Sequence, residues 1–308
     1  MLTTLLSLYI ISVIEPNVTP RSPNVIPSVS AIVKTASFDF ESLAKEKTIP
    51  IKDPTMISPI IGATSSIAVD MDTGAILYEK NSHERRPIAS LTKLMTITIV
   101  LEENALDDVV EISRDAATTE GSIMFLKTGE QITVKDLLLG ALVHSANDAA
   151  EALAQYNAGS IEAFVEKMNK KALQLGLLNT HFSNPVGLDT ADNYSSAYDL
   201  AKLSRYMYQK QFVQNAALLK EVKVTSVDGK YTHNLSSTNE LLGNEYYNIK
   251  GLKTGKTDLA GLCMIAVAEN EQGNKIITVL LDSPSRFTES KILIDWTFRA
   301  YNWGNPAE

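Results

Sequence analysis

Apolar residues recur at helical spacing through the middle of the chain. Three segments follow the i, i+3, i+4, i+7 stripe of an amphipathic helix, within residues 134–142, 161–168 and 200–207. The stripes are Val134, Leu137, Leu138, Ala141 and Leu142; Ile161, Phe164, Val165 and Met168; and Leu200, Leu203 and Met207. The pattern predicts three helices in this central part.

The flanking parts show β-type patterns. Ser65–Asp70 and Ala75–Glu79 are joined by the turn sequence Asp72-Thr73-Gly74, which predicts a hairpin. Four further strands are predicted near the other end, over residues 222–227, 249–254, 262–268 and 275–281, and the last two are continuous apolar runs typical of adjacent antiparallel core strands. A closing helix is expected over Glu289–Tyr301, with Leu293, Trp296, Thr297 and Ala300 on one face. Strands at both ends around a helical middle indicate an α/β (α+β) fold, in which one antiparallel sheet is built from both chain ends and the helical lobe is inserted.

The first 59 residues differ from the rest. Residues 1–14 form an apolar segment of signal-peptide length, which we interpret as an export signal or a short membrane anchor. A frayed apolar tail or a misplaced start is the alternative, since no positive charge precedes the apolar core. Residues 15–59 carry Pro16, Pro20, Pro23 and Pro27 and are interpreted as a linker, with a short helix possible over residues 38–47. Residues 60–304 are then expected to form the folded domain.

Composition excludes several function classes. The net charge is −8 and no basic stripe is present, so nucleic-acid binding has no electrostatic support. Cys263 is the single cysteine, which rules out an intramolecular disulfide, and its apolar surroundings predict a buried core residue. The four histidines are scattered, so neither a zinc site nor any other cofactor is indicated.

A serine and a lysine stand three residues apart in the string Pro87-Ile88-Ala89-Ser90-Leu91-Thr92-Lys93. If the apolar run that follows is helical, Ser90 and Lys93 share one helix face, where a deprotonated lysine would activate the hydroxyl. The alternative is a serine at a helix start beside a solvated lysine. Two later triplets add to the pattern: Ser145-Ala146-Asn147, predicted to lie between the first two helices of the central part, and Lys253-Thr254-Gly255.

The ordered set of Ser-x-x-Lys, Ser-x-Asn and Lys-Thr-Gly is the signature of penicillin-binding proteins and class A β-lactamases. From Ser58 to Trp303 the chain resembles the low-molecular-mass penicillin-binding proteins, in particular the serine D-alanyl-D-alanine carboxypeptidases. The longer strings Thr133-Val134-Lys135-Asp136-Leu137-Leu138, Asn184-Pro185-Val186-Gly187-Leu188-Asp189 and Gly251-Leu252-Lys253-Thr254-Gly255 belong to the same resemblance. It implies a β-lactamase/transpeptidase-like fold with the site between sheet and helical lobe.

The resemblance implies a role for each motif residue. Ser90 would be the acylated nucleophile, Lys93 its general base and Lys253 a second cation that disfavours a charge on Lys93. Ser145 would relay protons, and Asn147 would hold the substrate amide. Thr254 would contact the substrate carboxylate, Gly255 would allow close approach, and the backbone N–H groups of Ser90 and Lys256 would form the oxyanion hole. Arg286 would grip the terminal carboxylate, with a surface ion pair to Glu289 as the alternative.

The implied activity is removal of the terminal D-alanine from peptidoglycan stem peptides outside the cytoplasm, with β-lactams as inhibitors. A DD-endopeptidase that cleaves cross-links uses the same site and is the alternative. A β-lactamase would need a glutamate to activate the deacylating water, and the usual Glu-x-x-Leu-Asn string does not follow Ser145. A non-catalytic sensor is disfavoured, because all the catalytic residue types are retained.

Overall fold

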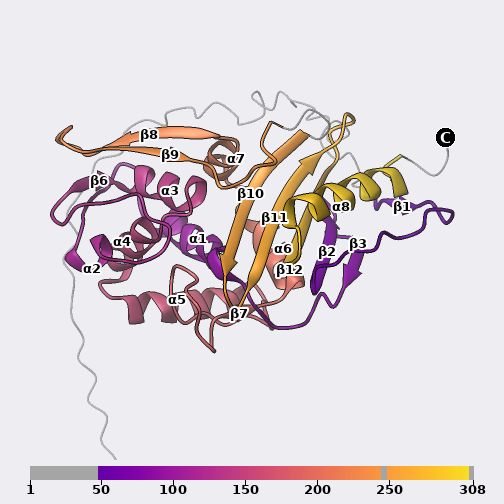
Figure 1. Cartoon of the computed structure of the whole chain (residues 1–308), viewed down its shortest axis with the longest axis horizontal. Helices are drawn as coiled ribbons and strands as arrows, with labels where there is room; N and C mark the ends of the chain where they lie inside the picture. Colours follow the sequence, from indigo (N-terminus) through magenta and orange to yellow (C-terminus); the bar gives the residue numbers. More distant parts are fainter. Residues whose placement is uncertain (1–47, 244–247, 305–308) are drawn as a thin grey trace, which may run out of the picture. The chain divides into compact units, whose positions relative to one another are not determined.

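A five-stranded antiparallel sheet joins the two ends of the sequence. The computed structural model describes residues 48–243 and 248–304. The sheet has the order β10-β11-β12-β2-β3 (Figure 1), and its strands are β2 Ser65–Asp70, β3 Ile76–Lys80, β10 Asn248–Thr257, β11 Gly261–Glu269 and β12 Lys275–Ser283. In the centre β2 pairs with β12, with Ile67 opposite Val279. The predicted sheet from both chain ends is therefore confirmed, and β10, which carries Lys253-Thr254-Gly255, is an edge strand.

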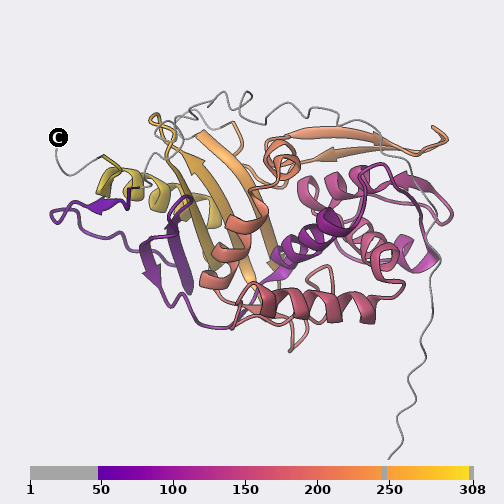
Figure 2. The ribbon, with the colours of Figure 1, turned by 180° about the vertical axis from the view of Figure 1, so that it is seen from behind.

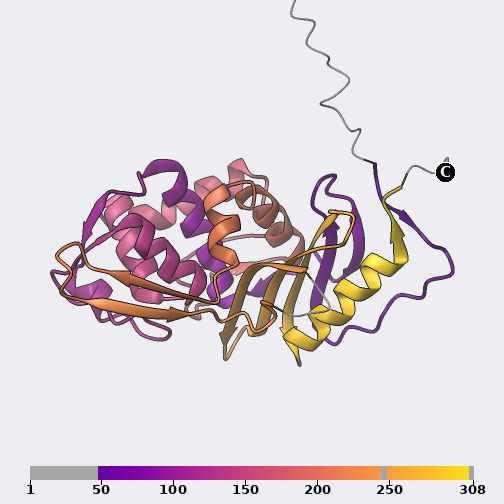
Figure 3. The same ribbon diagram turned by 90° about the horizontal axis from the view of Figure 1, so that it is seen from above.

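The two continuous apolar runs are explained by burial on both faces of the sheet. In β12, Ile277 and Val279 belong to the core on one face, whereas Ile276 and Leu280 belong to the core on the other. The closing helix α8, Arg286–Ala300, packs on the second face, and its predicted inward residues Leu293, Trp296, Thr297 and Ala300 are all buried. Figure 3 shows α8 on one side of the sheet and the other helices on the opposite side. A strand covered on both sides needs no polar alternation.

The helical lobe and the sheet-covering helix α6 lie on the face opposite α8 (Figure 2). These helices are α1 Lys93–Glu103, α2 Arg114–Ala117, α3 Val134–Val143, α4 Asn147–Ala158, α5 Ile161–Gln174, α6 Ala197–Met207 and α7 Gln211–Ala217. The three helices predicted from apolar stripes are α3, α5 and α6. Each begins after a side-chain cap, in which Thr133, Ser160 or Ser196 accepts a hydrogen bond from a backbone N–H three residues on.

Helix α4 was not predicted. Its buried face is built mainly from Ala149, Ala150, Ala152 and Ala154, whose small side chains give little hydrophobic contrast along the sequence. The second triplet therefore spans the α3–α4 turn, and Asn147 is the first residue of α4 rather than part of a long connection. The predicted strand over residues 222–227 is β8 Glu221–Thr225, and it pairs with an unpredicted strand, β9 Thr232–Ser236.

Three further strand pairs complete the structure. They are β1 Ile51–Lys52 with β13 Tyr301–Asn302, β4 Arg86–Pro87 with β7 Tyr194–Ser195, and β5 Val109–Glu111 with β6 Gln131–Thr133. Since β1 pairs with the strand that follows α8, regular pairing begins before the predicted linker boundary at residue 60. The predicted apolar segment 1–14 and the possible helix over residues 38–47 lie outside the described residues. Within the described ranges, no helix is long and apolar enough to span a bilayer.

Candidate active site

Ser90 and Lys93 lie where a tight turn becomes a helix. Ala89–Thr92 form a short 3₁₀ helix that continues directly into α1 at Lys93. Ala89 has φ +48°, a left-handed conformation that costs a non-glycine residue energy and is common near functional sites. Ser90 is partly exposed, whereas Lys93 is fully buried. The alternative of a solvated lysine is therefore wrong.

The amine of Lys93 has three hydrogen-bonding neighbours. Its Nζ lies 3.0 Å from Ser90 Oγ, 2.6 Å from Asn147 Oδ1 and 2.7 Å from the carbonyl oxygen of Val186. The amide and carbonyl oxygens accept hydrogens only. A neutral amine has two hydrogens and one lone pair, so these two acceptors leave the lone pair for the Ser90 hydroxyl.

The surroundings of Lys93 favour this neutral form. Burial, and next the positive charge of Lys253, hold the pKa of Lys93 well below its ordinary value, while the carboxylate of Asp148 opposes the shift. Burial, and next the charge of Arg286, lower the pKa of Lys253 to about 7. Both lysines therefore exchange protons much more readily than a solvated lysine near neutral pH.

Ser145 connects the second lysine to the cleft. Lys253 Nζ donates to Ser145 Oγ at 2.8 Å and to the carbonyl oxygen of Thr254 at 2.9 Å. Ser145 has φ +63°, so the turn between α3 and α4 aims its side chain by a backbone conformation that non-glycine residues rarely adopt. All three residues are buried.

Asp148 follows the second triplet and was not singled out from the sequence. Its carboxylate accepts hydrogen bonds from the backbone N–H groups of Met124 and Leu126, at 3.0–3.1 Å, and is 1% exposed. Asn147 completes the link, because its Nδ2 donates to the carbonyl oxygen of Glu120 at 2.6 Å. The segment 120–126 is therefore fixed to the start of α4 beside Lys93.

The edge strand β10 approaches Ser90 closely at Gly255. A Cβ built on Gly255 would lie 3.1 Å from the Ile88 carbonyl oxygen and 3.2 Å from the Ser90 nitrogen, tighter than ordinary packing. The glycine thus brings the backbone of β10, including the exposed Lys256, next to the nucleophile.

Arg286 lies behind this edge, at the start of α8. Its Nη1 donates to the Gly255 carbonyl oxygen at 2.8 Å, and burial lowers its pKa. Glu289 instead accepts hydrogen bonds from the backbone N–H groups of Gly62 and Ala63. Among the described residues, the alternative ion pair between Arg286 and Glu289 is not formed.

The loop 183–193 provides the Val186 carbonyl and is held by one side chain. Asn184 Oδ1 accepts from the backbone N–H groups of Val186, Gly187 and Leu188, at 2.6–3.2 Å. Asn184 Nδ2 donates to the Leu188 carbonyl oxygen at 3.0 Å. The string Asn184–Asp189 was noted for its family resemblance. Its contact with Lys93, however, is made by the backbone carbonyl of Val186, so the residue types alone do not predict it.

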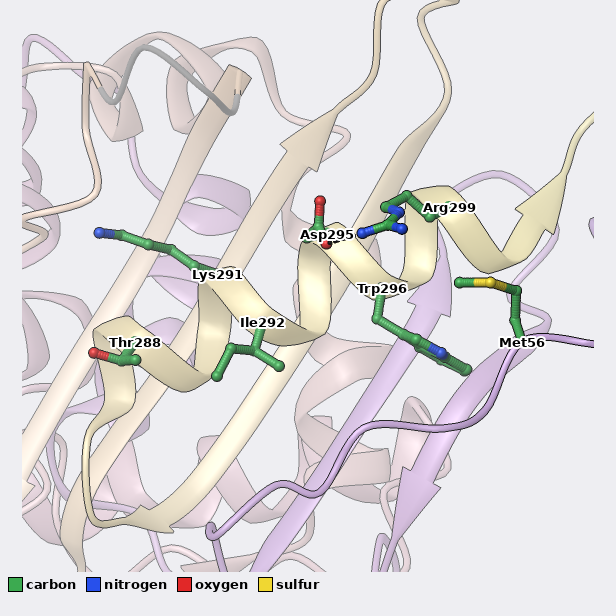
Figure 4. Close-up of a pocket in the computed structure, with 7 residues that line it drawn as sticks. All are labelled: Met56, Thr288, Lys291, Ile292, Asp295, Trp296 and Arg299. Atoms are coloured by element: carbon green, nitrogen blue, oxygen red, sulfur yellow. Dashed lines mark hydrogen bonds and ion pairs between the residues drawn. The ribbon is translucent and has the colours of Figure 1, made fainter.

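Three further observations concern metal binding, a surface hollow and the single cysteine. Within the described ranges, no cluster of three histidine, cysteine, aspartate or glutamate side chains is arranged to hold a metal ion. An open hollow of about 350 Å³ lies on the outer side of α8 (Figure 4), and its lining includes Ile292, Trp296 and Arg299. It is separated by the sheet from Ser90. Cys263 is buried, as predicted, and burial raises the pKa of its thiol to about 11.

A serine hydroxyl beside a buried lysine amine is the arrangement expected of a class of protein, the serine acyl-transfer enzymes. Residues 52–285 match the family model described as D-alanyl-D-alanine carboxypeptidase, peptidase S11. The chain belongs to this family.

Similar proteins support the same assignment. The chain is 38% identical over 249 residues to the D-alanyl-D-alanine carboxypeptidase DacF of Bacillus subtilis, covering 78% of this chain and 63% of the relative. It is 36% identical to DacC of Escherichia coli, covering 82% and 66%, and 35% identical to a D-alanyl-D-alanine endopeptidase of Pseudomonas aeruginosa, covering 74% of each chain. The first two comparisons span slightly less than two thirds of the relatives' length.

The solved structure of the Streptomyces K15 DD-transpeptidase superposes with a TM-score of 0.75 at 30% identity, covering 79% of this chain and 99% of that one. Penicillin binding protein 5 of Haemophilus influenzae gives 0.73 at 34% identity, covering 79% and 72%. The expected β-lactamase/transpeptidase-like fold is confirmed.

Proposed function

We propose that this protein is a serine DD-carboxypeptidase, which removes the terminal D-alanine from peptidoglycan stem pentapeptides through an acyl-enzyme on Ser90. The observation that carries the proposal is the distance of 3.0 Å between Lys93 Nζ and Ser90 Oγ, with the side chain of Lys93 fully buried. A buried lysine with a lowered pKa is the activated base that a weak serine nucleophile requires.

In the acylation step, Ser90 Oγ adds to the carbonyl carbon of the penultimate D-alanine while Lys93 takes the hydroxyl proton. The backbone N–H groups of Ser90 and Lys256 stabilise the resulting oxyanion. The C–N bond then breaks, and the leaving amine takes a proton through Ser145, which Lys253 resupplies. The proton that Lys93 took from Ser90 then replaces the one that Lys253 lost, so that Lys93 is neutral again and the net transfer is from Ser90 to the leaving amine. Free D-alanine leaves, and the remaining acyl group is an ester of Ser90.

Deacylation uses the same base. Water enters the position that D-alanine has left, Lys93 accepts its proton, and hydroxide adds to the ester carbon. Collapse of this intermediate breaks the ester bond and returns the proton to Ser90 Oγ. A β-lactam keeps its leaving nitrogen tethered to the acyl group, so the same water is obstructed and the adduct persists. β-Lactams are therefore expected to inhibit the enzyme rather than be rapidly hydrolysed.

Substrate recognition is assigned to the edge of the sheet. Asn147 holds the substrate amide, and Thr254 and Arg286 bind the carboxylate of the terminal D-alanine. Lys253 and Arg286 add positive charge next to that carboxylate, which favours an anionic chain end over an internal peptide bond. No cofactor takes part in these steps.

The deciding experiment combines covalent labelling with product analysis. A penicillin should add its mass to the tryptic peptide that contains Ser90, and a pentapeptide ending in D-Ala-D-Ala should lose one D-alanine by mass spectrometry. Ser90→Ala should abolish both, whereas Ser58→Ala, at an exposed serine, should change neither. Labelling that survives Ser90→Ala would refute the assignment.

A DD-endopeptidase is the second candidate, and the similarity to the endopeptidase of Pseudomonas aeruginosa over 74% of each chain favours it. A cross-linked muropeptide added to the same assay separates the two: free D-alanine indicates the carboxypeptidase, and resolved monomers indicate the endopeptidase. Rapid penicillin hydrolysis without either product would indicate a β-lactamase, and a stable adduct without turnover of any peptide would indicate a sensor.

Action on peptidoglycan requires a position outside the cytoplasmic membrane. We assign export or anchoring to residues 1–14 and the spacer to residues 15–50, on the composition of these segments and because β1 already belongs to the folded domain. Cell fractionation tests this directly, and activity found only in the cytosol would contradict it.

A further inference from the structure

A short segment after β9 brings an unassigned hydroxyl to the carboxylate end of the site. The segment is attached to the turn that precedes Ser145: Thr238 N donates to the Val143 carbonyl oxygen at 3.2 Å, and His144 Nδ1 donates to the Ser236 carbonyl oxygen at 3.0 Å. These two hydrogen bonds fix Thr238 between the helical lobe and the edge strand β10.

The Thr238 side chain reaches the threonine of the third motif. The two hydroxyl oxygens, Thr238 Oγ1 and Thr254 Oγ1, lie 2.6 Å apart, and either of them is able to donate. Thr254 is 4% exposed, whereas Thr238 is partly exposed. Two hydroxyls contain two hydrogens and their mutual bond uses one, so one O–H always remains free to donate to a third group.

Positive charges flank this hydroxyl pair. Lys253 Nζ donates to the carbonyl oxygen of Thr254, and Arg286 Nη1 donates to that of Gly255, the next residue. In the described part of the chain, the buried Nε of Arg286 has no hydrogen-bond partner. A free O–H donor beside two cations forms a site that an anionic oxygen satisfies better than a neutral one.

We propose that Thr238 is a specificity-determining residue, whose hydroxyl acts with that of Thr254 to select substrates that end in a carboxylate. The inference rests on the proposed function and extends it, because it separates recognition of the chain end from the chemistry at Ser90. When Thr238 donates to Thr254, Thr254 donates to the carboxylate, and when the mutual bond reverses, Thr238 donates instead. In the first arrangement the bond from Thr238 also fixes the direction of the Thr254 O–H, whereas the hydroxyl of Thr254 without this partner would be free to rotate away from the carboxylate.

The test compares two thioesters that share one acyl-D-alanyl group. One has mercaptoacetate as the leaving group, which carries a carboxylate, and the other has the methyl ester of mercaptoacetate, which is neutral. In Thr238→Val, kcat/KM for the carboxylate substrate should fall about tenfold, as expected for a hydrogen bond to a charged group, and should change less than twofold for the neutral one. Thr238→Ser should restore most of the selectivity.

Thr232→Val is the matched control. Thr232 Oγ1 lies 3.4 Å from Thr225 Oγ1 in an exposed hydroxyl pair between β9 and β8. The control variant therefore also removes a contact between two threonine hydroxyls, but one outside the proposed site. It should alter neither rate. Equal losses for both substrates in Thr238→Val, or no loss for either, would overturn the assignment of Thr238. Wild-type protein that cleaves neither thioester would overturn the proposed function itself, before any variant is compared.

Discussion

Lys93 Nζ donates to the carbonyl oxygen of Val186, 2.7 Å away, and both residues are buried although 93 positions separate them in the chain. The lysine of the first motif is thus oriented by the backbone of a loop that belongs to none of the three motifs. That loop depends on Asn184, whose side chain holds three consecutive N–H groups.

Asn184→Ala should therefore slow acylation by a β-lactam about tenfold or more, because the Val186 carbonyl loses its fixed position and Lys93 loses its orientation. Asn270→Ala is the control. Asn270 also holds a loop, with its Oδ1 accepting from the backbone N–H groups of Gln272 and Asn274, but that loop joins β11 to β12. Stopped-flow acylation rates should separate the two variants, and equal rates would contradict the role of Asn184.

Gly187→Ala should abolish labelling of Ser90. Gly187 has φ +88°, and a Cβ there would lie 1.9 Å from the carbonyl oxygen of Ala89, so the residue before the nucleophile must move. Gly159→Ala is the matched control, with φ +80° and no atom within 4 Å of the added Cβ. It should cost about 1 kcal/mol of stability through backbone strain alone and leave labelling intact. Normal labelling of Ser90 in Gly187→Ala would contradict this prediction, because it would show that the loop 183–193 can shift without disturbing the site.

The rate of acylation should rise with pH and level off well below pH 10. In the proposed mechanism neutral Lys93 is the active form, and its pKa is held well below the ordinary value by burial and by Lys253. Single-turnover rates with a penicillin across pH 5–10 measure the midpoint. A rate that is flat over this range, with the fold intact, would exclude Lys93 as the titrating base.

Lys253→Met should stabilise the folded protein, most strongly at low pH. The folded pKa of Lys253 is about 7, against about 10.4 for an unfolded lysine. The unfolded chain therefore binds more protons between these values, and wild-type stability rises with pH across that window. The advantage of the variant should be largest below pH 7, at most roughly 5 kcal/mol, and should shrink towards pH 10. Melting temperatures at pH 6 and pH 9.5 test the sign, and a gap that widens with pH would contradict it.

Patterns that depend on local spacing predicted the structure well. The stripe at Leu200, Leu203 and Met207 located α6, and the apolar run over residues 275–281 located β12. Helix α4 was missed because alanines give weak contrast, and β9 was missed because it alternates polar residues with only His233 and Leu235 buried.

Contacts through backbone atoms or between distant residues were beyond sequence reasoning. The three motifs gave the side chains around Ser90, but not the Val186 carbonyl on Lys93, the Thr238 hydroxyl on Thr254, or Asp148 on the segment 124–126. For Arg286 the sequence offered two carboxylate partners, that of the substrate and that of Glu289, and the structure has a third partner, the carbonyl oxygen of Gly255. Such partners are selected by three-dimensional packing rather than by residue type.

The pairing of β2 with β12 sets the order in which the protein becomes active during its synthesis. Ser65 faces Leu281, so the first core strand waits for a partner made more than two hundred residues later. Ser90 and Lys93 are synthesised well before Lys253 and the edge strand β10. A nascent chain interrupted before residue 253 has neither the central pairing of β2 with β12 nor the second lysine. The site around Ser90 is therefore incomplete until β10, β11 and β12 have been made and have joined β2.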